Sequence, residues 1–185
     1  MEKNLLTLAK EAQPHLGSLI VAAKINGEIR DIQTSCTDAD EISFVELNSA
    51  LGWSIYRRSV LFLLIAAVHK LDNNAEVIAK FTVNKGLYCE IKIPAGELDP
   101  SFIKEIEDRM GDMIAANIPI EKRSIPRQEA INLFQKLGRE GKVNLLSALS
   151  NPTISIYTCD GYTDYLYGAM LPETKDLGLF ELDYE

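Results

Sequence analysis

The chain has 185 residues, of which 46% are apolar and 25% are charged, an ordinary composition for one large or two small globular domains. Its 19 basic and 27 acidic residues give a formal net charge of −8, so most of its surface is expected to repel a polyanion. No window approaches the roughly 20 uninterrupted apolar residues that cross a bilayer, and no signal-peptide pattern precedes the first helix, so we expect a cytoplasmic protein without a membrane span. The cysteines, Cys36, Cys89 and Cys159, are widely spaced without a Cys-x-x-Cys pair, which argues against a disulfide scaffold or a zinc ribbon.

The first fifty residues predict a small α+β module. Asn4 is suited to cap a short amphipathic helix, and Pro14 is suited to end it. Asn26-Gly27 predicts a tight hairpin, because both residues accept the positive φ angles that such a turn requires. The predicted elements are a helix over 5–13 and strands over 20–25, 28–32 and 41–47.

The remaining residues predict a larger α+β module. Residues 52–71 are apolar on most faces and too many for a strand, so they predict a long buried helix that ends at Asp72. Asp160-Gly161 predicts a second tight hairpin, and Asp99 is suited to cap a helix. Further helices are predicted over 100–117, 127–137 and 141–149, and strands over 76–83, 87–93, 120–125, 154–158, 162–167 and 178–184, the first two joined by Asn84-Lys85-Gly86.

Several segments carry, in order, a resemblance to a known family. They are 5–13, 22–29, 40–44, the helix after Arg58, 86–91, 118–123 and the segment around Gly168. This set resembles the N-terminal half of threonyl-tRNA synthetase. The resemblance implies a β-grasp-like TGS module over 1–50, followed over 51–185 by an editing-like α+β domain with an antiparallel sheet and a long buried helix. A TGS domain begins with a β-hairpin, which this chain is expected to lack, so we expect its first fifty residues to be less well packed than the rest.

The editing domain of that family carries His-x-x-x-His on its long helix and a later Asp-x-Cys-x-Gly-Pro-His segment. Residues i and i+4 share a helix face, so two imidazoles can converge on a metal ion or a polarised water. In this chain the matching positions hold Arg58, Phe62, Leu166 and Met170. None of these side chains can do the original chemistry, so we expect no catalytic residue, no metal and no cofactor, with Asp164, Gly168 and Pro172 keeping the local frame.

The same pair of modules also resembles the N-terminal region of bacterial uridine kinases, especially over 47–59 and 158–164. In those proteins an ATP-binding P-loop domain follows. The segment 138–143 has the wrong glycine spacing for a P-loop and lacks the Ser or Thr that meets magnesium. Any kinase domain is therefore expected beyond residue 185.

The leading hypothesis is a non-catalytic binding or regulatory region of a nucleoside kinase-like protein, with a nucleoside or nucleotide as its ligand. An RNA-binding module and a freestanding hydrolase of mischarged tRNA remain as alternatives, as does a scaffold for oligomer contacts. The candidate binding residues are Arg57, Arg58, Lys122, Arg123, Lys142 and Asp164. The basic clusters are small and are also typical of solvated surface, and His69 is expected to be structural.

Overall fold

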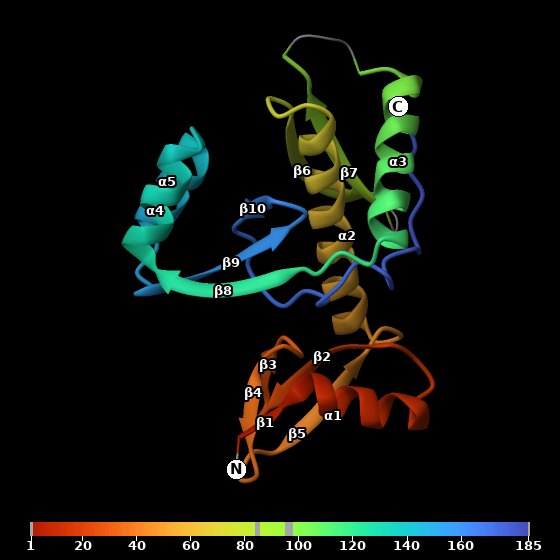
Figure 1. Cartoon of the computed structure of the whole chain (residues 1–185), viewed down its shortest axis with the longest axis vertical. Coiled ribbons are helices and arrows are strands. Elements are labelled where there is room, and N and C mark those ends of the chain that lie inside the picture. Colours follow the sequence, from red (N-terminus) through yellow and green to blue (C-terminus); the bar gives the residue numbers. More distant parts are fainter. Residues whose placement is uncertain (1, 84–85, 95–97, 185) are drawn as a thin grey trace.

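The computed structural model describes residues 2–83, 86–94 and 98–184. The chain is a mixed α+β protein with antiparallel sheets and one long central helix (Figure 1). Its first part contains β1 (Glu2–Asn4), α1 (Leu5–Ala12), a 3-10 turn (Gln13–His15), β2 (Ile20–Ile25), β3 (Glu28–Arg30), β4 (Ser35–Thr37) and β5 (Ile42–Glu46). Its second part contains α2 (Ala50–Leu71), β6 (Glu76–Val83), β7 (Gly86–Lys92), α3 (Pro100–Ala115), β8 (Glu121–Pro126), α4 (Arg127–Lys136), α5 (Glu140–Ala148), β9 (Thr153–Cys159) and β10 (Tyr162–Asp164).

The first part is an antiparallel sheet with strand order β3-β2-β5, against which α1 packs (Figure 1). The predicted hairpin is confirmed, with φ of 52° at Asn26 and 84° at Gly27. Asn4 also caps α1, because its side chain accepts a hydrogen bond from the Leu6 amide at 2.8 Å. Val21 and Ala22 on β2 have no exposed surface.

A second strand pair, β1–β4, was not predicted. The segment Glu2–Asn4 lies antiparallel to Ser35–Thr37. Strands this short show too little alternation to be recognised from sequence, and their pairing depends on a partner about thirty residues away.

The long predicted helix is confirmed as α2, which begins beside the first sheet and runs through the second part (Figure 1). The Ser49 hydroxyl caps it by accepting from the Gly52 amide at 3.0 Å. Among the residues that the structure describes, α2 is the one helix long and apolar enough to span a membrane, and 56% of that stretch is buried inside the fold. It is therefore placed as the core helix of the fold.

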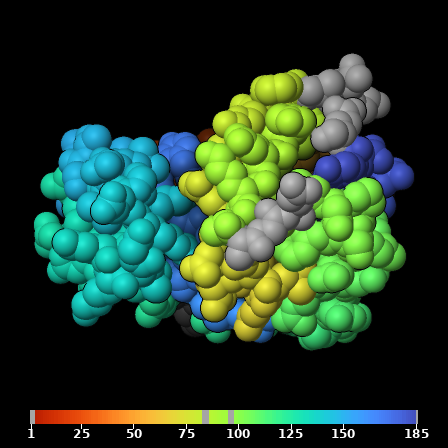
Figure 2. Space-filling model, turned by 90° about the horizontal axis from the view of Figure 1, so that it is seen from above, coloured from red at the N-terminus to blue at the C-terminus, as the bar shows by residue number. Residues whose placement is uncertain are grey.

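The second part surrounds α2 with two antiparallel sheets, β10-β9-β8 and β6-β7. The predicted turn at Asp160-Gly161 is confirmed by φ angles of 48° and 78°. Helix α3 packs beside α2, whereas α4 and α5 form a separate lobe over β8 and β9. Seen from above, that lobe and the β6–β7 side of the molecule are two masses on either side of the β9–β10 region (Figure 2).

Of two strand predictions near the C-terminus, one was too long and the other was wrong. The predicted strand over 162–167 ends at Asp164, and 178–184 is not a strand. In 178–184, Phe180 and Leu182 still pack against the central core, which explains the alternating pattern. The segment is held by a hydrogen bond to a side chain and not by strand pairing. The Leu179 amide donates to the Tyr56 hydroxyl at 2.8 Å. The expected turn residues Asn84 and Lys85 lie outside the described residues.

Candidate functional site

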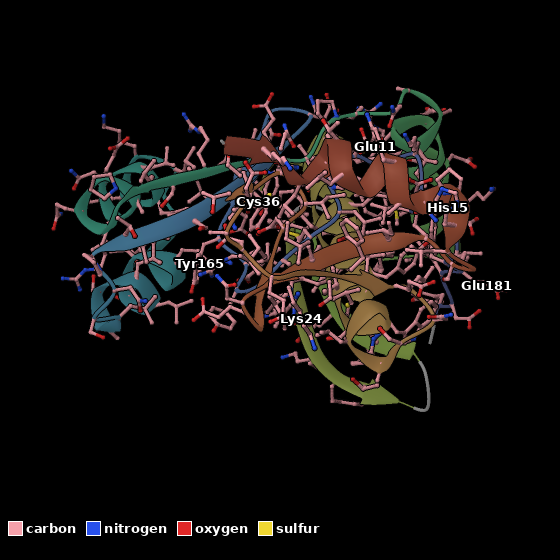
Figure 3. All side chains as sticks on the ribbon, turned by 90° about the horizontal axis from the view of Figure 1, so that it is seen from below. Glu11, His15, Lys24, Cys36, Tyr165 and Glu181 are labelled. Atoms are coloured by element: carbon pink, nitrogen blue, oxygen red, sulfur yellow. The ribbon has the colours of Figure 1, made fainter. Side chains whose placement is uncertain are left out.

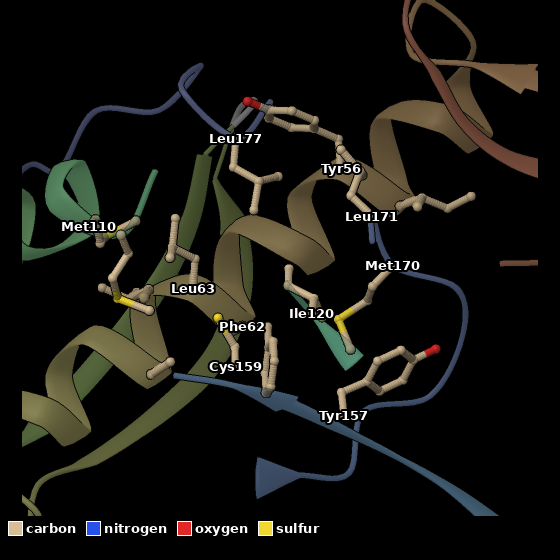
Figure 4. Packing of buried hydrophobic residues seen from close by; sticks show 14 of the residues in the cluster. Tyr56, Phe62, Leu63, Met110, Ile120, Tyr157, Cys159, Met170, Leu171 and Leu177 are labelled. Atoms are coloured by element: carbon tan, nitrogen blue, oxygen red, sulfur yellow. The ribbon is translucent and has the colours of Figure 1, made fainter. Parts of the chain in front are cut away.

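The site begins with the four positions that matched the editing residues, and two of these are now part of the hydrophobic core. Phe62 and Met170 are 0% and 1% exposed (Figure 4). The Phe62 ring makes an edge contact with Tyr157, with centroids 6.3 Å apart, and a tilted contact with Tyr162 at 5.9 Å. The Phe62 ring has no atom that binds a metal ion, and the buried Met170 thioether is a weak hydrogen-bond acceptor and a poor ligand for zinc.

Arg58 is held by the loop that follows β10. Its Nη1 donates to the carbonyl oxygen of Ala169 at 2.8 Å. Gly168 has a φ of 107°, and a Cβ at this position would lie 2.8 Å from the Arg58 guanidinium carbon. Glycine is therefore required here by both the backbone conformation and the close approach of Arg58. Leu166, the fourth matching position, is half-buried on the same loop.

A carboxylate from the first part of the chain reaches the same region. Asp31 is 2% exposed and accepts hydrogen bonds from the Tyr157 hydroxyl at 3.0 Å and from the Met170 amide at 2.9 Å. It also forms an ion pair with Lys122. Burial, and then the Asp31 charge, raise the pKa of Tyr157 above its usual range. No local pattern in the sequence pointed to Asp31, because it lies within a segment predicted to be an ordinary strand.

Asp164 and Lys142 meet, which their spacing in the sequence did not reveal. Their charged groups are 2.9 Å apart. Asp164 is 3% exposed and also accepts from the Tyr162 hydroxyl at 3.0 Å and from the Tyr165 amide at 2.7 Å, while Lys142 donates to the Tyr165 carbonyl. This ion pair fixes the end of β10 against α5, and its hydrogen-bonding capacity is largely used within the protein.

An open pocket of about 300 Å³ lies next to Arg58, between α2, the β6–β7 hairpin and the loop after β10. We call it the arginine pocket; its lining residues are Ser54, Arg57, Arg58, Leu61, Thr82, Leu87, Leu166 and Tyr167. Arg57 makes no hydrogen bond or ion pair with any residue in the described part of the chain. Tyr167 is 84% exposed. The pocket therefore offers a guanidinium and an aromatic ring to a ligand.

The structure separates the candidate binding residues into groups. Arg57 and Arg58 line the arginine pocket, whereas Lys122 is committed to Asp31 and lies 5.8 Å from the centre of the Tyr157 ring. Arg123 is exposed on β8, and because successive strand residues face opposite sides, it points away from Lys122. Arg58 and Lys122 both lie near Tyr157, but the Lys122 ammonium is paired with Asp31 and Arg123 faces the other side of β8.

His69, Cys36 and Cys159 do not line the arginine pocket. The His69 ring is tilted against Tyr162 at 4.8 Å, and burial, then the charge of Arg139, lower its pKa. Cys36 and Cys159 are buried; burial, then Asp160, raises the pKa of Cys159 to about 11. His15 ends the 3-10 turn that follows α1, far from Tyr165 (Figure 3). Within 2–83, 86–94 and 98–184, no group of three or more His, Cys, Asp or Glu residues could hold a metal ion.

No protein-family model matches the chain. It is 32% identical over 163 residues to the threonine–tRNA ligase of Syntrophotalea carbinolica, covering 88% of this chain and 26% of that protein. It is 30% identical to the threonine–tRNA ligases of Acidithiobacillus ferrooxidans, over 96% of this chain and 28% of the relative, and of Pelobacter propionicus, over 95% and 27%. The chain thus spans about a quarter of the length of these curated relatives.

This similarity shows that the chain is related to threonyl-tRNA synthetase over most of its length. It supports a synthetase-like module of the editing or RNA-binding type. The TGS assignment, the boundary at residue 50 and the kinase parent stay predictions.

Proposed function

We propose that this chain is a non-catalytic nucleotide-binding module of threonyl-tRNA synthetase ancestry, which holds one nucleotide unit in the arginine pocket. The observation that carries the proposal is Arg57, a half-buried arginine without a partner among the described residues, at a pocket edged by the exposed ring of Tyr167. A guanidinium binds phosphate oxygens in a bidentate manner, and an exposed aromatic ring stacks on a base.

The proposal excludes hydrolysis because the groups that could activate a water are replaced or already used. Phe62 and Met170 are buried hydrocarbon and thioether groups, and the buried Asp164 carboxylate is already engaged by Lys142, Tyr162 and the Tyr165 amide. General base catalysis needs a group within reach of a water in an accessible site. No cofactor is part of the proposed activity.

A single nucleotide unit fits better than a long RNA track. RNA affinity grows with the number of phosphates that cations neutralise, and Lys122 and Lys142 are engaged in internal ion pairs. The net charge of −8 also opposes a polyanion along the rest of the surface. The nucleotide is either free or the end of an RNA chain.

The setting we propose is the accessory region of a cytoplasmic nucleoside kinase-like protein, with a TGS-like module over 1–50 and an editing-like module over 51–185. A free nucleotide sensed in the arginine pocket is then the regulatory ligand. An RNA end is the alternative ligand, and the sequence similarity to threonine–tRNA ligases favours it.

The test is isothermal titration calorimetry with UMP, uridine and a short single-stranded RNA. We expect saturable UMP binding, weaker binding of uridine, and at least a tenfold loss for Arg57→Ala, because the phosphate loses its charged partner. Arg123→Ala, the matched control on β8, is expected to leave UMP binding unchanged. Absence of binding by all three ligands, or UMP binding that ignores both Arg57→Ala and Tyr167→Ala, overturns the proposal.

The RNA arm separates the two ligand sources. The RNA end is a ligand of this pocket if UMP displaces the RNA and if the RNA affinity falls with salt concentration only as much as one phosphate contact requires. A steep salt slope and sensitivity to Arg123→Ala instead identify an extended RNA track. Hydrolysis of mischarged tRNA that is lost in Asp164→Asn contradicts the non-catalytic proposal.

A further inference from the structure

A second, more apolar pocket of about 220 Å³ lies beside the arginine pocket. We call it the apolar pocket. One wall is a stripe along α2 at helical spacing, formed by Trp53, Tyr56, Arg57, Val60, Leu61 and Leu64. The other walls come from β7, from Met110 on α3 and from the irregular segment 179–182. Residues from distant parts of the chain thus converge on one hollow.

Arg57 is the exception in this stripe, because the other five side chains are aromatic or aliphatic. A cation in such a position is normally paired, yet Arg57 has no hydrogen-bond or ion-pair partner in the described chain. The other charged residue of the lining is Glu181, which is exposed on the segment 179–182 at the edge of the molecule (Figure 3). The pocket therefore combines apolar walls with one unpaired positive group.

We propose that the apolar pocket binds a small apolar carboxylic acid, with its hydrocarbon part between α2, β7 and 179–182 and its carboxylate on Arg57. An engineered apolar cavity of about 150 Å³ holds benzene, so this somewhat larger pocket fits a phenyl ring with a short chain or an alkyl chain of about six to ten carbons. The carboxylate supplies the charge that Arg57 lacks, in the bidentate geometry that guanidinium groups favour.

The site is separate from the proposed nucleotide site but adjoins it. Arg57, Leu61 and Leu87 line both pockets, whereas Cys89 and Met110 belong to the apolar pocket and Thr82 and Tyr167 to the arginine pocket. A bound carboxylate therefore occupies the guanidinium that the nucleotide phosphate would use. The acid is expected to compete with UMP if both sites exist, and to bind by itself if the nucleotide proposal fails.

Trp53 provides the readout, because it is the only tryptophan of the chain and lines the apolar pocket at 37% exposure. Titration of the full chain with butyrate, hexanoate and octanoate is followed by Trp53 emission and by calorimetry. Each buried methylene is expected to increase affinity by about fourfold. We expect octanoate to saturate one site and octanol, which lacks the charge, to bind at least tenfold more weakly.

The variants distinguish this site from adventitious binding. Arg57→Ala is expected to abolish the preference for octanoate over octanol. Cys89→Phe fills the apolar pocket, so it is expected to reduce octanoate binding at least tenfold while UMP binding persists. Arg123→Ala is the control and leaves both unchanged. The proposal is overturned if the unmodified protein binds octanoate and octanol with equal affinity. It is also overturned if fatty-acid binding does not saturate or if the affinity does not increase with the length of the acid. Both results are obtained even where Cys89→Phe does not fold.

Discussion

At the residue scale, the position of Asp31 explains how the region that matches the editing site is held together. A carboxylate from the first part of the chain accepts hydrogen bonds from Tyr157 and from the Met170 amide, and it neutralises Lys122. A buried polar group without partners destabilises a fold, so each member of this set depends on the others. These hydrogen bonds and the ion pair therefore hold the backbone and side chains next to Phe62 and Met170 in place.

Replacing Asp31 by Asn is expected to lower the free energy of unfolding by about 2 kcal/mol. The substitution removes the charge that pairs with Lys122, and the loss is smaller than for a fully buried pair because Lys122 is 27% exposed. Urea denaturation measures the change. Glu90→Gln is the control, because it breaks the exposed Lys80–Glu90 pair and is expected to leave stability unchanged. An Asp31→Asn protein as stable as the control variant contradicts a structural role for the network.

Stability is also expected to fall at alkaline pH. The pKa of Cys159 is raised to about 11 by burial and then by Asp160, and burial likewise raises the pKa values of Tyr157 and Tyr162. These groups keep their protons in the folded state while the unfolded chain loses them, so their contribution is complete below pH 9 and is lost as pH rises. Cys159 by itself accounts for about 1.4 kcal/mol per pH unit between pH 9 and 11.

Urea unfolding of the reduced protein at pH 8 and at pH 10.5 checks this slope. Between these two pH values, Cys159→Ala is expected to lose about 2 kcal/mol less stability than the unmodified chain, even though the variant is less stable at pH 8. A pH-independent free energy of unfolding in the unmodified chain contradicts the assignment.

At the element scale, α2 determines the arrangement because it packs against β2 and β5 of the first part and against α3 and β6 of the second part. Its first turn crosses the end of β5 so closely that a Cβ on Gly52 would lie 2.0 Å from the Glu46 carbonyl oxygen. Glycine has poor helix propensity, so its presence in this turn reflects the crossing and not the helix itself. Helix α3 contains a glycine in a different environment, since a Cβ on Gly111 would meet nothing within 4 Å.

These two helical glycines provide a matched pair of substitutions. Gly52→Ala is expected to destabilise the protein by about 2–3 kcal/mol, because the backbone of β5 must move away. Gly111→Ala is expected to stabilise it by about 0.5–1 kcal/mol through helix propensity. Thermal unfolding followed by circular dichroism compares them, and similar effects of the two changes would show that the crossing at Gly52 is not tight.

At the scale of the whole molecule, the two predicted modules share one core. Val21, Ala22 and Val45 of the first sheet belong to the same buried cluster as Phe62 and Leu63 of α2. The side chain of Gln33 also donates to the Ile120 carbonyl at 2.7 Å, in addition to the Asp31 contacts. Because the two modules share a buried cluster and are joined by hydrogen bonds, they are expected to unfold together.

We therefore expect the whole chain to unfold in one cooperative step. Trp53 fluorescence reports the junction between the modules, and far-ultraviolet circular dichroism reports all helices and sheets. The two signals should give the same urea midpoint within error. Two separate transitions, with the residues of 1–50 losing hydrogen-exchange protection first, would instead support independent modules.

The sequence by itself determined most of the local structure and the chemical character of the site. Asn26-Gly27 and Asp160-Gly161 specify their turns because few residues accept positive φ, and the length and apolar character of 52–71 specify a buried helix. Arg58, Phe62, Leu166 and Met170 predicted the loss of editing chemistry from residue types alone. The turns and the helix are confirmed because each depends on neighbouring residues, whereas the loss of editing chemistry stays a prediction.

The tertiary structure decided which distant groups meet. It brings Asp31 to Tyr157, pairs Asp164 with Lys142, and leaves Arg57 between two pockets, although no spacing in the sequence connects these residues. It also leaves 178–184 without a strand partner despite the alternation of Phe180 and Leu182. Alternation records which side chains are buried, whereas strand pairing and charge pairing require a partner whose position is set only when the whole chain packs.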